Sequence, residues 1–282
     1  MSFRTLISTA ALALHLDDPA FVIVDCRYKL DDESWGEREY TNLHISGAVY
    51  AHLGRDLSGP KSGTNGRHPL PDPRVLAETF GRLGIESGMQ VVAYDQDNGM
   101  YASRLWWLLR WLGHDAVAVL DGGLKKWVAE DRPTKGEVEH RARRTFSGLP
   151  RPDMAIDATT VAALKDNTDW KLVDARAPER YRGETEPIDA TPGHIPGAVN
   201  HFFQGNLDER GIFRSPEELR AKFGAVLGSR VDSARVVCYC GSGVTACHNL
   251  LALEHAGLKG AKLYPGSWSE WSSDPSRPIE TG

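Results

Sequence analysis

The residues with the clearest chemical potential lie between positions 236 and 250, which hold three of the four cysteines in the chain. The segment reads Val-Val-Cys-Tyr-Cys-Gly-Ser-Gly-Val-Thr-Ala-Cys-His-Asn-Leu, so an apolar strand leads through a glycine-containing loop into a helix. Cys240 stands where the strand ends, and ligands of parallel α/β sheets bind beyond the carboxyl ends of strands. The pattern therefore predicts that Cys240 is a nucleophile at a binding loop.

The loop after Cys240 is expected to bind an anion, and it consists of Gly241, Ser242, Gly243, Val244 and Thr245. Two glycines allow successive backbone N–H groups to turn inward, and the following helix adds its positive N-terminal end. These surroundings favour a thiolate over a thiol, and they would also hold a persulfide, whose terminal sulfur is negative. Ser242 can hydrogen-bond an arriving or departing group and help to move a proton. The alternative is a buried structural cysteine in front of an ordinary helix cap.

Two other cysteine chemistries fit this segment less well. A cysteine phosphatase needs an arginine six residues after the cysteine to grip the phosphate, and that position holds Ala246. A metal site built from Cys238, Cys240, Cys247 and His248 would not have a usual zinc spacing, so no metal or other cofactor is expected. Cys238 is interpreted either as a core residue or as a resolving thiol for oxidised Cys240, and a regulatory role for Cys247 is left open.

The elements that must position this loop occur twice, because the sequence contains an internal duplication. The matched segments are 22–27 with 171–176, 44–49 with 194–199, 91–95 with 236–240, and 122–127 with 266–271. The partners stay roughly 145–150 residues apart, which is the signature of a repeated unit. Asp95 falls where Cys240 falls, so the first copy lacks the nucleophile.

Each copy alternates short apolar runs with amphipathic stretches, which indicates a mostly parallel sheet flanked by helices. In the second copy, residues 171–174 and 235–239 are predicted strands, and residues 216–227 and 245–255 are predicted helices. In the first copy, Ser8 or Thr9 is expected to cap a helix that ends near 17–19, before an apolar strand at 21–24. We predict a silent domain at 1–135, a polar linker at 136–154 and a catalytic domain at 155–282.

The amino-acid composition bears on which kinds of molecule the protein could bind. The chain has 282 residues, a formal net charge of −5 and 25% charged residues, which gives no support for a nucleic-acid partner. No apolar run approaches the roughly 20 residues needed to cross a bilayer. The four cysteines do not form a spread-out disulfide framework, so a reducing, cytoplasmic setting is expected.

The Cys-Gly-Ser-Gly-Val-Thr loop after a strand resembles the active-site loop of the rhodanese superfamily, and especially that of 3-mercaptopyruvate sulfurtransferases. The paired Asp-x-Arg and His-Ile-x-Gly-Ala motifs and the segment 266–271 are also similar to rhodanese motifs, so the resemblance covers essentially the whole chain. It implies two tandem rhodanese-like domains with the active loop in the second. It also implies that Cys240 carries sulfur as a persulfide between a donor and an acceptor.

The resemblance also implies donor-binding residues, because the donor is a small anion. Arg180 matches the family's donor-binding arginine, and Arg182 could assist it. Mercaptopyruvate enzymes usually carry a second arginine about nine residues later, where this chain has Glu186-Pro187-Ile188-Asp189. That difference favours thiosulfate, whereas Ser242 favours mercaptopyruvate, and the balance leans slightly to mercaptopyruvate.

Residues of the first copy are expected to contribute as well. His68 matches a family histidine that faces the active-site cleft, although it could instead cap a loop, and Arg104 could point into the same cleft. The family's Cys-Ser-Asp triad would need an aspartate where this chain has Gly54, and Asp56 lies two residues late. Whether Asp56 replaces the missing aspartate is left open. Asp25, Arg27, Asp174 and Arg176 occur in both copies, so we assign them a structural role.

The sequence thus predicts a sulfurtransferase that moves sulfur from 3-mercaptopyruvate or thiosulfate to cyanide, a small thiol or a thioredoxin-like protein. A function of another class stays open, in which the protein is a persulfide carrier or binding module without turnover. The acceptor and the oligomeric state are not predicted.

Overall fold

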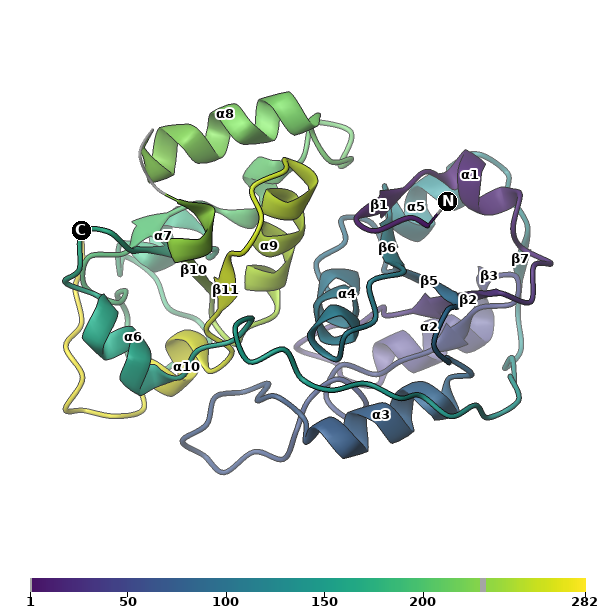
Figure 1. Cartoon of the computed structure of the whole chain (residues 1–282), viewed down its shortest axis with the longest axis horizontal. Helices are drawn as coiled ribbons and strands as arrows, with labels where there is room; N and C mark the ends of the chain where they lie inside the picture. Colours follow the sequence, from purple (N-terminus) through teal and green to yellow (C-terminus); the bar gives the residue numbers. More distant parts are fainter. Residues whose placement is uncertain (1, 229–231) are drawn as a thin grey trace. The chain divides into compact units, whose positions relative to one another are not determined.

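The computed structural model describes residues 2–228 and 232–282 and divides the chain into two compact units (Figure 1). The first unit comprises residues 1–59, 71–151 and 209–212. The second comprises residues 60–70, 152–208 and 213–282. Each unit therefore includes one short segment that lies, in the sequence, within the stretch of the other.

The first unit is built on a five-stranded parallel sheet with the order β1-β6-β5-β2-β4. Its strands are β1 (Leu6–Ile7), β2 (Phe21–Asp25), β4 (Val49–Tyr50), β5 (Gln90–Tyr94) and β6 (Val117–Leu120). Every residue of β2, β5 and β6 is buried, as expected for strands that helices cover on both faces. A separate antiparallel pair joins β3 (His44–Ile45) to β7 (Thr134–Lys135).

Five helices cover this sheet, and two of them, α1 and α3, begin at a side-chain cap. The five helices are α1 (Thr9–Ala13), α2 (Trp35–Asn42), α3 (Pro73–Arg82), α4 (Ala102–Trp111) and α5 (Gly123–Ala129). Ser8 caps α1 by accepting a hydrogen bond from the backbone N–H of Ala11, and Asp72 caps α3 ahead of Pro73. The first helix is shorter than predicted, because it ends at Ala13 and the chain continues in turns to β2.

The helices of the first unit form layers on its sheet. Leu12 of α1 and Trp127 of α5 share one hydrophobic cluster with Ile23 and Val92 of the sheet. Figure 1 shows α1 and α5 side by side, and α4 packs separately against β5 and β6. The carboxyl ends of the strands are left to the loops, which is where sites of parallel sheets lie.

The second unit repeats this plan with a four-stranded parallel sheet in the order β11-β10-β8-β9. Its strands are β8 (Lys171–Asp174), β9 (Val199–Asn200), β10 (Val236–Tyr239) and β11 (Lys262–Leu263). Its helices are α6 (Ala158–Leu164), α7 (Pro178–Tyr181), α8 (Pro216–Leu227), α9 (Thr245–His255) and α10 (Ser267–Trp271), with 3-10 turns η1 (Phe203–Asn206) and η2 (Ser233–Arg235). The predicted elements 171–174, 216–227 and 245–255 are confirmed, and the strand predicted at 235–239 begins one residue later.

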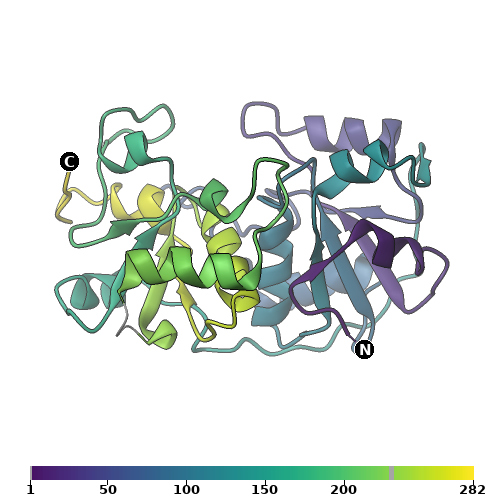
Figure 2. The same ribbon diagram turned by 90° about the horizontal axis from the view of Figure 1, so that it is seen from above.

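Helices again lie on both sides of the second sheet. Val161 of α6 and Trp271 of α10 share a cluster with Leu172 and Val237 of the sheet. Helix α8 packs on α9, and α9 packs on β10 and β11. Figure 2 shows α8 and α9 of this unit from above, as the green and yellow-green ribbons.

Minor pairings extend the repeat beyond the main strands. Ala155 pairs in parallel with Leu263, as β1 pairs with β6, and His194 pairs in antiparallel with Glu280, as β3 pairs with β7. The two sheets therefore share one topology, which confirms the predicted tandem α/β architecture. No helix in residues 2–228 and 232–282 is both long and apolar enough to cross a membrane.

A buried ion pair lies at the carboxyl end of β2 in the first copy and of the corresponding strand, β8, in the second. The Arg27 Nε donates to both carboxylate oxygens of Asp25 at 3.1 and 2.9 Å, and its Nη2 reaches the Leu43 carbonyl at 2.6 Å. In the second copy, Arg176 binds Asp174 in the same way, and its Nη2 reaches the Gly193 carbonyl at 2.6 Å. These contacts tie the strand end to the loop that follows, in line with the structural role assigned to the pairs.

Replacing Arg27 with Met is expected to lower the free energy of unfolding by about 3–5 kcal/mol, because the fully buried Asp25 carboxylate would lose its counter-charge. Arg38→Met is the matched control, since the Arg38–Asp32 pair is about half exposed and its loss should change the unfolding free energy far less than the loss of the buried pair. Urea denaturation of the full chain measures both values. Equal small losses in the two variants would contradict the anchoring role.

Candidate active site

Strand β10 delivers Cys240 to the carboxyl end of the second sheet. The strand lies between β8 and β11, and its last residue, Tyr239, is in register with Asp174 of β8. The Tyr239 hydroxyl accepts a hydrogen bond from the backbone N–H of Ile195 at 3.2 Å, and this contact holds the end of the strand in place. Cys240 itself is only 2% exposed, so its thiol lies in a nearly closed site.

The segment at the start of α10 holds the backbone on both sides of Cys240. The Ser267 hydroxyl accepts from the Cys240 N–H at 3.1 Å and donates to the Tyr264 carbonyl at 2.9 Å. The N–H of Trp268 donates to the Cys240 carbonyl, and the N–H of Ser269 donates to the Gly241 carbonyl, both at 2.9 Å. Three consecutive residues therefore fix the backbone of Cys240 and Gly241.

Ser267 makes its contact from a strained backbone. Its φ is +54°, in the left-handed region that glycine normally occupies. The matching residue of the first copy is Gly123, with a φ of +57°. The second copy thus keeps the turn but replaces glycine with a side chain that binds the Cys240 backbone. Sequence reasoning noted the Gly-Ser-Trp motif without assigning this role, and the glycine in the silent copy was the available signal.

Gly243 provides the donor that reaches the sulfur of Cys240. Its backbone N–H donates to Cys240 Sγ at 3.1 Å, as expected for an inward-turned amide. Its φ is +75°, and an added Cβ would lie 2.4 Å from the Pro265 carbonyl oxygen, so only glycine fits there. This contact supports the interpretation of the loop as an anion cradle.

Gly241 differs from the role that the sequence suggested for it. Its φ is not positive, so the backbone does not require glycine at this position. An added Cβ would instead lie 2.8 Å from Nη2 of Arg67 and 3.7 Å from Nη2 of Arg180. The missing side chain leaves room for two guanidinium groups beside the residue that follows Cys240.

His68 lies against Ser242, the middle residue of the loop. In the sequence, residues 60–70 lie between two stretches of the first unit. In the structure, they belong to the second unit. His68 Nδ1 lies 2.8 Å from Ser242 Oγ, and both side chains are buried. The pair can relay a proton, with the direction set by the histidine tautomer.

The predicted donor-binding arginines have different surroundings. Arg180 belongs to α7, close to Gly241, and its Nη2 donates to Glu186 Oε1 at 2.6 Å. The Arg182 side chain is 42% exposed and forms an ion pair with Glu184 at 2.7 Å. Arg182 is therefore a solvent-facing charge in this structure, whereas Arg180 is partly buried near the loop.

The remaining predicted residues belong to the first unit. Arg104 is fully buried within α4. The carboxylate of Asp56 is buried and accepts from the His52 N–H at 2.8 Å and from Arg82 Nη2 at 2.6 Å. Gly54 donates its N–H to the ring of the same histidine, His52. Asp56 therefore serves a local network of its own unit.

The two other cysteines near the loop are buried and unoxidised. Cys247 lies in the first turns of α9, and its Sγ is 3.3 Å from the Gly243 carbonyl oxygen. Cys238 lies inside β10, where burial raises the pKa of its thiol and favours the protonated form. Cys238 is therefore a core residue, which was one of the two interpretations that the sequence allowed.

A buried polar cluster under α9 was not predicted. His201 Nε2 lies 2.8 Å from Asn206 Oδ1, and Asn206 Nδ2 donates to Asn249 Oδ1 at 2.8 Å. Asn249 in turn donates to the His201 carbonyl at 2.9 Å. Burial lowers the pKa of His201 and so favours its neutral form. The cluster ties α9, which starts at the loop, to the 3-10 turn η1.

In the first copy, the corresponding loop binds the carboxylate of one of its own residues, Asp95. The Asp95 carboxylate accepts hydrogen bonds from the backbone N–H groups of Gly99, Tyr101 and Ala102 at 2.9, 2.8 and 3.1 Å. Asp95 is fully buried and has taken the place of the cysteine. The duplicated loop is therefore an anion cradle in the copy that has no nucleophile, and this supports the same function for the loop at Cys240.

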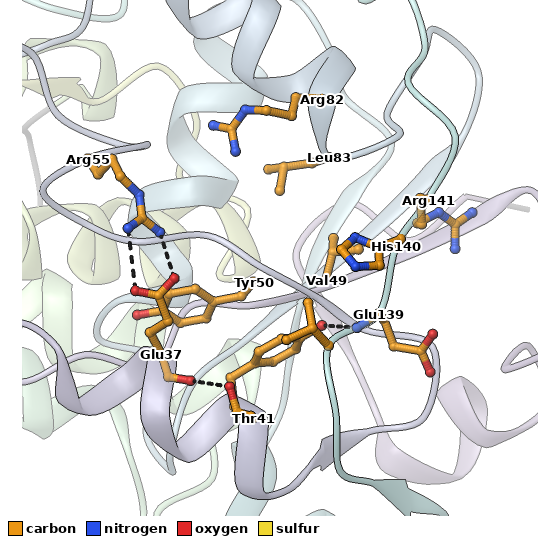
Figure 3. Close-up of a pocket in the computed structure, with 12 residues that line it drawn as sticks. Glu37, Thr41, Val49, Tyr50, Arg55, Arg82, Leu83, Glu139, His140 and Arg141 are labelled. Carbon is orange, nitrogen blue, oxygen red and sulfur yellow. Dashed lines mark hydrogen bonds and ion pairs between the residues drawn. The ribbon is translucent and has the colours of Figure 1, made fainter.

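A separate pocket of about 380 Å³ lies in the first unit, between α2, α3 and the chain after β7 (Figure 3). Arg55 and Glu37 point toward each other across it and pair at 3.3 Å. The Tyr40 hydroxyl accepts from the Glu139 N–H at 3.0 Å. No cysteine is among the residues that line this pocket.

Known proteins resemble this chain over its whole length. The rhodanese-like domain model matches residues 8–130 and 157–274. A probable 3-mercaptopyruvate sulfurtransferase of Pseudomonas aeruginosa is 49% identical over 286 residues, with complete coverage of both chains. The thiosulfate sulfurtransferase of Bos taurus is 33% identical and covers 95% of this chain and 92% of its own. The solved 3-mercaptopyruvate sulfurtransferase from Leishmania major superposes with a TM-score of 0.84 at 30% identity, covering 95% of this chain and 74% of that one.

The chain therefore belongs to the rhodanese family, with two rhodanese-like domains in tandem. Within that family it is a sulfurtransferase, which acts on a sulfur donor and a sulfur acceptor.

Gly243→Ala is expected to lower kcat/KM for sulfur transfer by about 100-fold or more, because the added Cβ would displace the N–H that donates to Cys240. Gly224→Ala is the matched control, since Gly224 lies in α8 with open space around it and alanine favours a helix. Steady-state kinetics and circular dichroism of both variants separate activity from folding. A Gly243→Ala enzyme with unchanged kcat/KM would show that the loop amide is not needed.

The raised pKa of Asp95 predicts that the stability of the protein depends on pH. Burial raises its pKa to about 6, so the folded state holds this proton more tightly than the unfolded chain. The stabilising contribution of the proton is complete below about pH 4 and is lost as the pH rises to 6. The unfolding free energy of the wild type minus that of Asp95→Asn should fall by about 2–3 kcal/mol between pH 4 and 7. Urea titrations at each pH test this, and a flat or rising difference would contradict the raised pKa.

Proposed function

We propose that this protein transfers the sulfur of 3-mercaptopyruvate to a thiophilic acceptor through a persulfide on Cys240. The observation that carries the proposal is the buried Cys240 Sγ with the Gly243 N–H directed at it, beside the guanidinium group of Arg180. An amide donor holds negative charge on sulfur, and a nearby arginine attracts an anionic donor. Relatives named as 3-mercaptopyruvate sulfurtransferases at 49% and 38% identity support this donor.

The first half-reaction is a nucleophilic attack at sulfur. The Cys240 thiolate forms an S–S bond to the thiol sulfur of mercaptopyruvate, and the C–S bond breaks with its electron pair passing to carbon. The resulting enolate takes up one proton and leaves as pyruvate. Ser242, in contact with His68, is suited to deliver that proton, since the pair joins a hydroxyl to a titratable ring.

The second half-reaction returns Cys240 to its starting state. The acceptor attacks the outer sulfur of the persulfide, the S–S bond breaks, and the electron pair returns to Cys240 Sγ. The Gly243 N–H then stabilises the released thiolate as it stabilised the attacking one. Cyanide, a small thiol or a thioredoxin-like protein has the required nucleophilic character.

Thiosulfate is the second candidate donor, with sulfite as the leaving group. The relatives named as thiosulfate sulfurtransferases in Bos taurus and Cricetulus griseus, at 33% and 34% identity, favour it. Both donors are anions with a transferable sulfur, so both need the arginine beside the loop. The structure's Ser242–His68 contact favours mercaptopyruvate, because only that donor leaves as a carbanion that needs a proton.

The remaining assignments are part of the same proposal. We propose residues 1–135 as the silent domain, 136–154 as the linker and 155–282 as the catalytic domain. Arg182 and Arg104 remain predictions as donor-binding residues. The four free cysteines support a reducing, cytoplasmic setting.

Wild-type protein is expected to turn over with cyanide as acceptor, with a higher kcat/KM for 3-mercaptopyruvate than for thiosulfate. Cys240→Ser should lose turnover with both donors, while Cys238→Ser keeps it, because Cys238 is a buried core residue. Intact-protein mass spectrometry after donor treatment should show the added mass of one sulfur atom in the wild type and in Cys238→Ser, but not in Cys240→Ser. A stable persulfide without turnover would show that the protein is a persulfide carrier and not an enzyme. Turnover in Cys240→Ser would show that Cys240 is not the nucleophile.

A further inference from the structure

Another pocket, of about 590 Å³, lies in the second unit beside the segment that holds the backbone of Cys240. It is bordered by α6 and α10, which Figure 1 shows side by side, and by part of the segment 60–70. Tyr264, Gly266 and Glu270 line it, whereas no residue of the Cys240 loop does. The pocket is therefore separate from the thiol, and its volume is that of a site for a small organic molecule.

The walls of this pocket combine apolar side chains with two negative charges. Apolar surface comes from the side chains of Pro69, Leu70 and Ile156. The charged groups are the carboxylates of Asp157 and Glu270, and the described residues that line the pocket include no lysine, arginine or histidine. The walls therefore suit a ligand that has a positive charge and an apolar body.

The duplication shows that the first copy has a cation at the position of Glu270. The matched residue is Lys126 of α5, whose Nζ lies 3.2 Å from Glu130 Oε1 and donates to Thr9 Oγ1 at the same distance. The second copy has a carboxylate here instead. An added Cβ on Gly266 would lie 1.6 Å from Glu270 Oε2, so the carboxylate folds over this glycine at the pocket wall. Because the second copy lacks the internal cation, an external one has a place to bind.

The second carboxylate also has no counterpart in the first copy. Asp157 caps α6, whereas the corresponding cap of α1 is the neutral Ser8. The Thr160 N–H donates to Asp157 Oδ1 at 2.8 Å, and hydrogen bonds from Thr160 hold the pKa of Asp157 below its usual value. Asp157 is therefore ionised at neutral pH and adds a second negative charge to the pocket.

Tyr264 brings a polar group without a partner to the same pocket. Its side chain is fully buried, and its hydroxyl has no hydrogen-bond partner at normal distance among the described residues. Burial, and then the neighbouring Glu270 carboxylate, raise the pKa of this hydroxyl, which therefore stays protonated. The first copy has Leu120 at this position, so the fold does not need the hydroxyl. An unpaired buried hydroxyl costs free energy, and a ligand N–H beside Glu270 would supply the missing partner.

We propose that this pocket binds a small organic cation, with an ammonium or amidinium group at Glu270 and Asp157 and an apolar body against the apolar walls. Hydrogen bonds between a charged donor and a carboxylate are the strong ones, and an amidinium presents two N–H groups in one plane to both carboxylate oxygens. The inference goes beyond the proposed function and does not depend on it, because sulfur transfer takes no part in the binding.

The test uses benzamidine, which joins an amidinium group to an apolar ring, and benzamide, which has nearly the same shape without the charge. Calorimetric titration of the full chain should show a single benzamidine site with a Kd of about 1 mM or lower. Benzamide should bind at least about 10-fold more weakly, because it cannot pair with the carboxylates. Equal affinity for the two compounds, or no binding of benzamidine, would overturn the inference.

Three substitutions locate the site. Glu270→Gln and Asp157→Asn should each raise the Kd for benzamidine by about 5-fold or more, since each removes a negative charge, and asparagine caps a helix as well as aspartate does. Glu270→Lys restores the residue of the first copy and should abolish binding, because its own ammonium group would take the place of the ligand. Circular dichroism checks that the variants are folded. An unchanged Kd in either folded Glu270 variant would contradict the assigned site.

Two further variants are controls for binding elsewhere. Asp169→Asn removes an exposed carboxylate of the second unit that pairs with Arg235, so the Kd for benzamidine should not change. Cys240→Ser should also bind benzamidine as the wild type does, because the Cys240 loop does not line the pocket. Loss of benzamidine binding in Cys240→Ser would place the cation at the sulfur site and rule out the separate pocket.

Discussion

The hydrogen bonds between the start of α10 and the Cys240 loop are the constraint on which the site depends. A strand end would normally leave its last residues free to adopt several loop conformations. Here Ser267, Trp268 and Ser269 bind the backbone of Cys240 and Gly241 at successive atoms. With the loop fixed, the Gly243 amide points at the sulfur, and the arginines approach the side that lacks a Cβ. Preorganised donors of this kind need no rearrangement when charge develops on sulfur.

The duplication shows how one loop design serves two purposes. In the first copy the cradle is filled by a carboxylate from the chain itself, so three or more amides are satisfied without any ligand. In the second copy the Cys240 thiol takes that place, and its sulfur accepts a hydrogen bond from the Gly243 amide. The Asp–Arg pairs and the stacked Tyr–His pairs persist in both copies, because they hold the strand ends together whether or not the loop is active.

The fold was accessible from the sequence because its signals are local. Helices α8 and α9 were predicted to the residue, since Ser215 with Pro216 marks one start and the glycine loop marks the other. The end of α1 was misjudged, because the turns after Leu14 keep the apolar spacing of a helix without its hydrogen bonds. The tandem sheet followed from the repeat alone.

The site was only partly accessible, because several of its contacts join distant parts of the chain. The sequence pointed to Cys240, Ser242 and Arg180 because each lies in a short local motif. Arg67 lies 122 residues from its partner Asp189, and no local pattern marks it. The polar cluster of His201, Asn206 and Asn249 was missed for the same reason, since Asn249 lies more than 40 residues from the other two.

The segment 60–70 has a consequence for how such a protein can change over generations. The first copy, which has Asp95 where the second has Cys240, encodes both Arg67 and His68, and these residues lie against the loop of the second copy. A gene that began at the linker would still encode Cys240 but would lose the arginine over Gly241 and the ring against Ser242. The first copy therefore supplies two residues to the surroundings of the Cys240 loop, so this arrangement of side chains needs both halves of the chain.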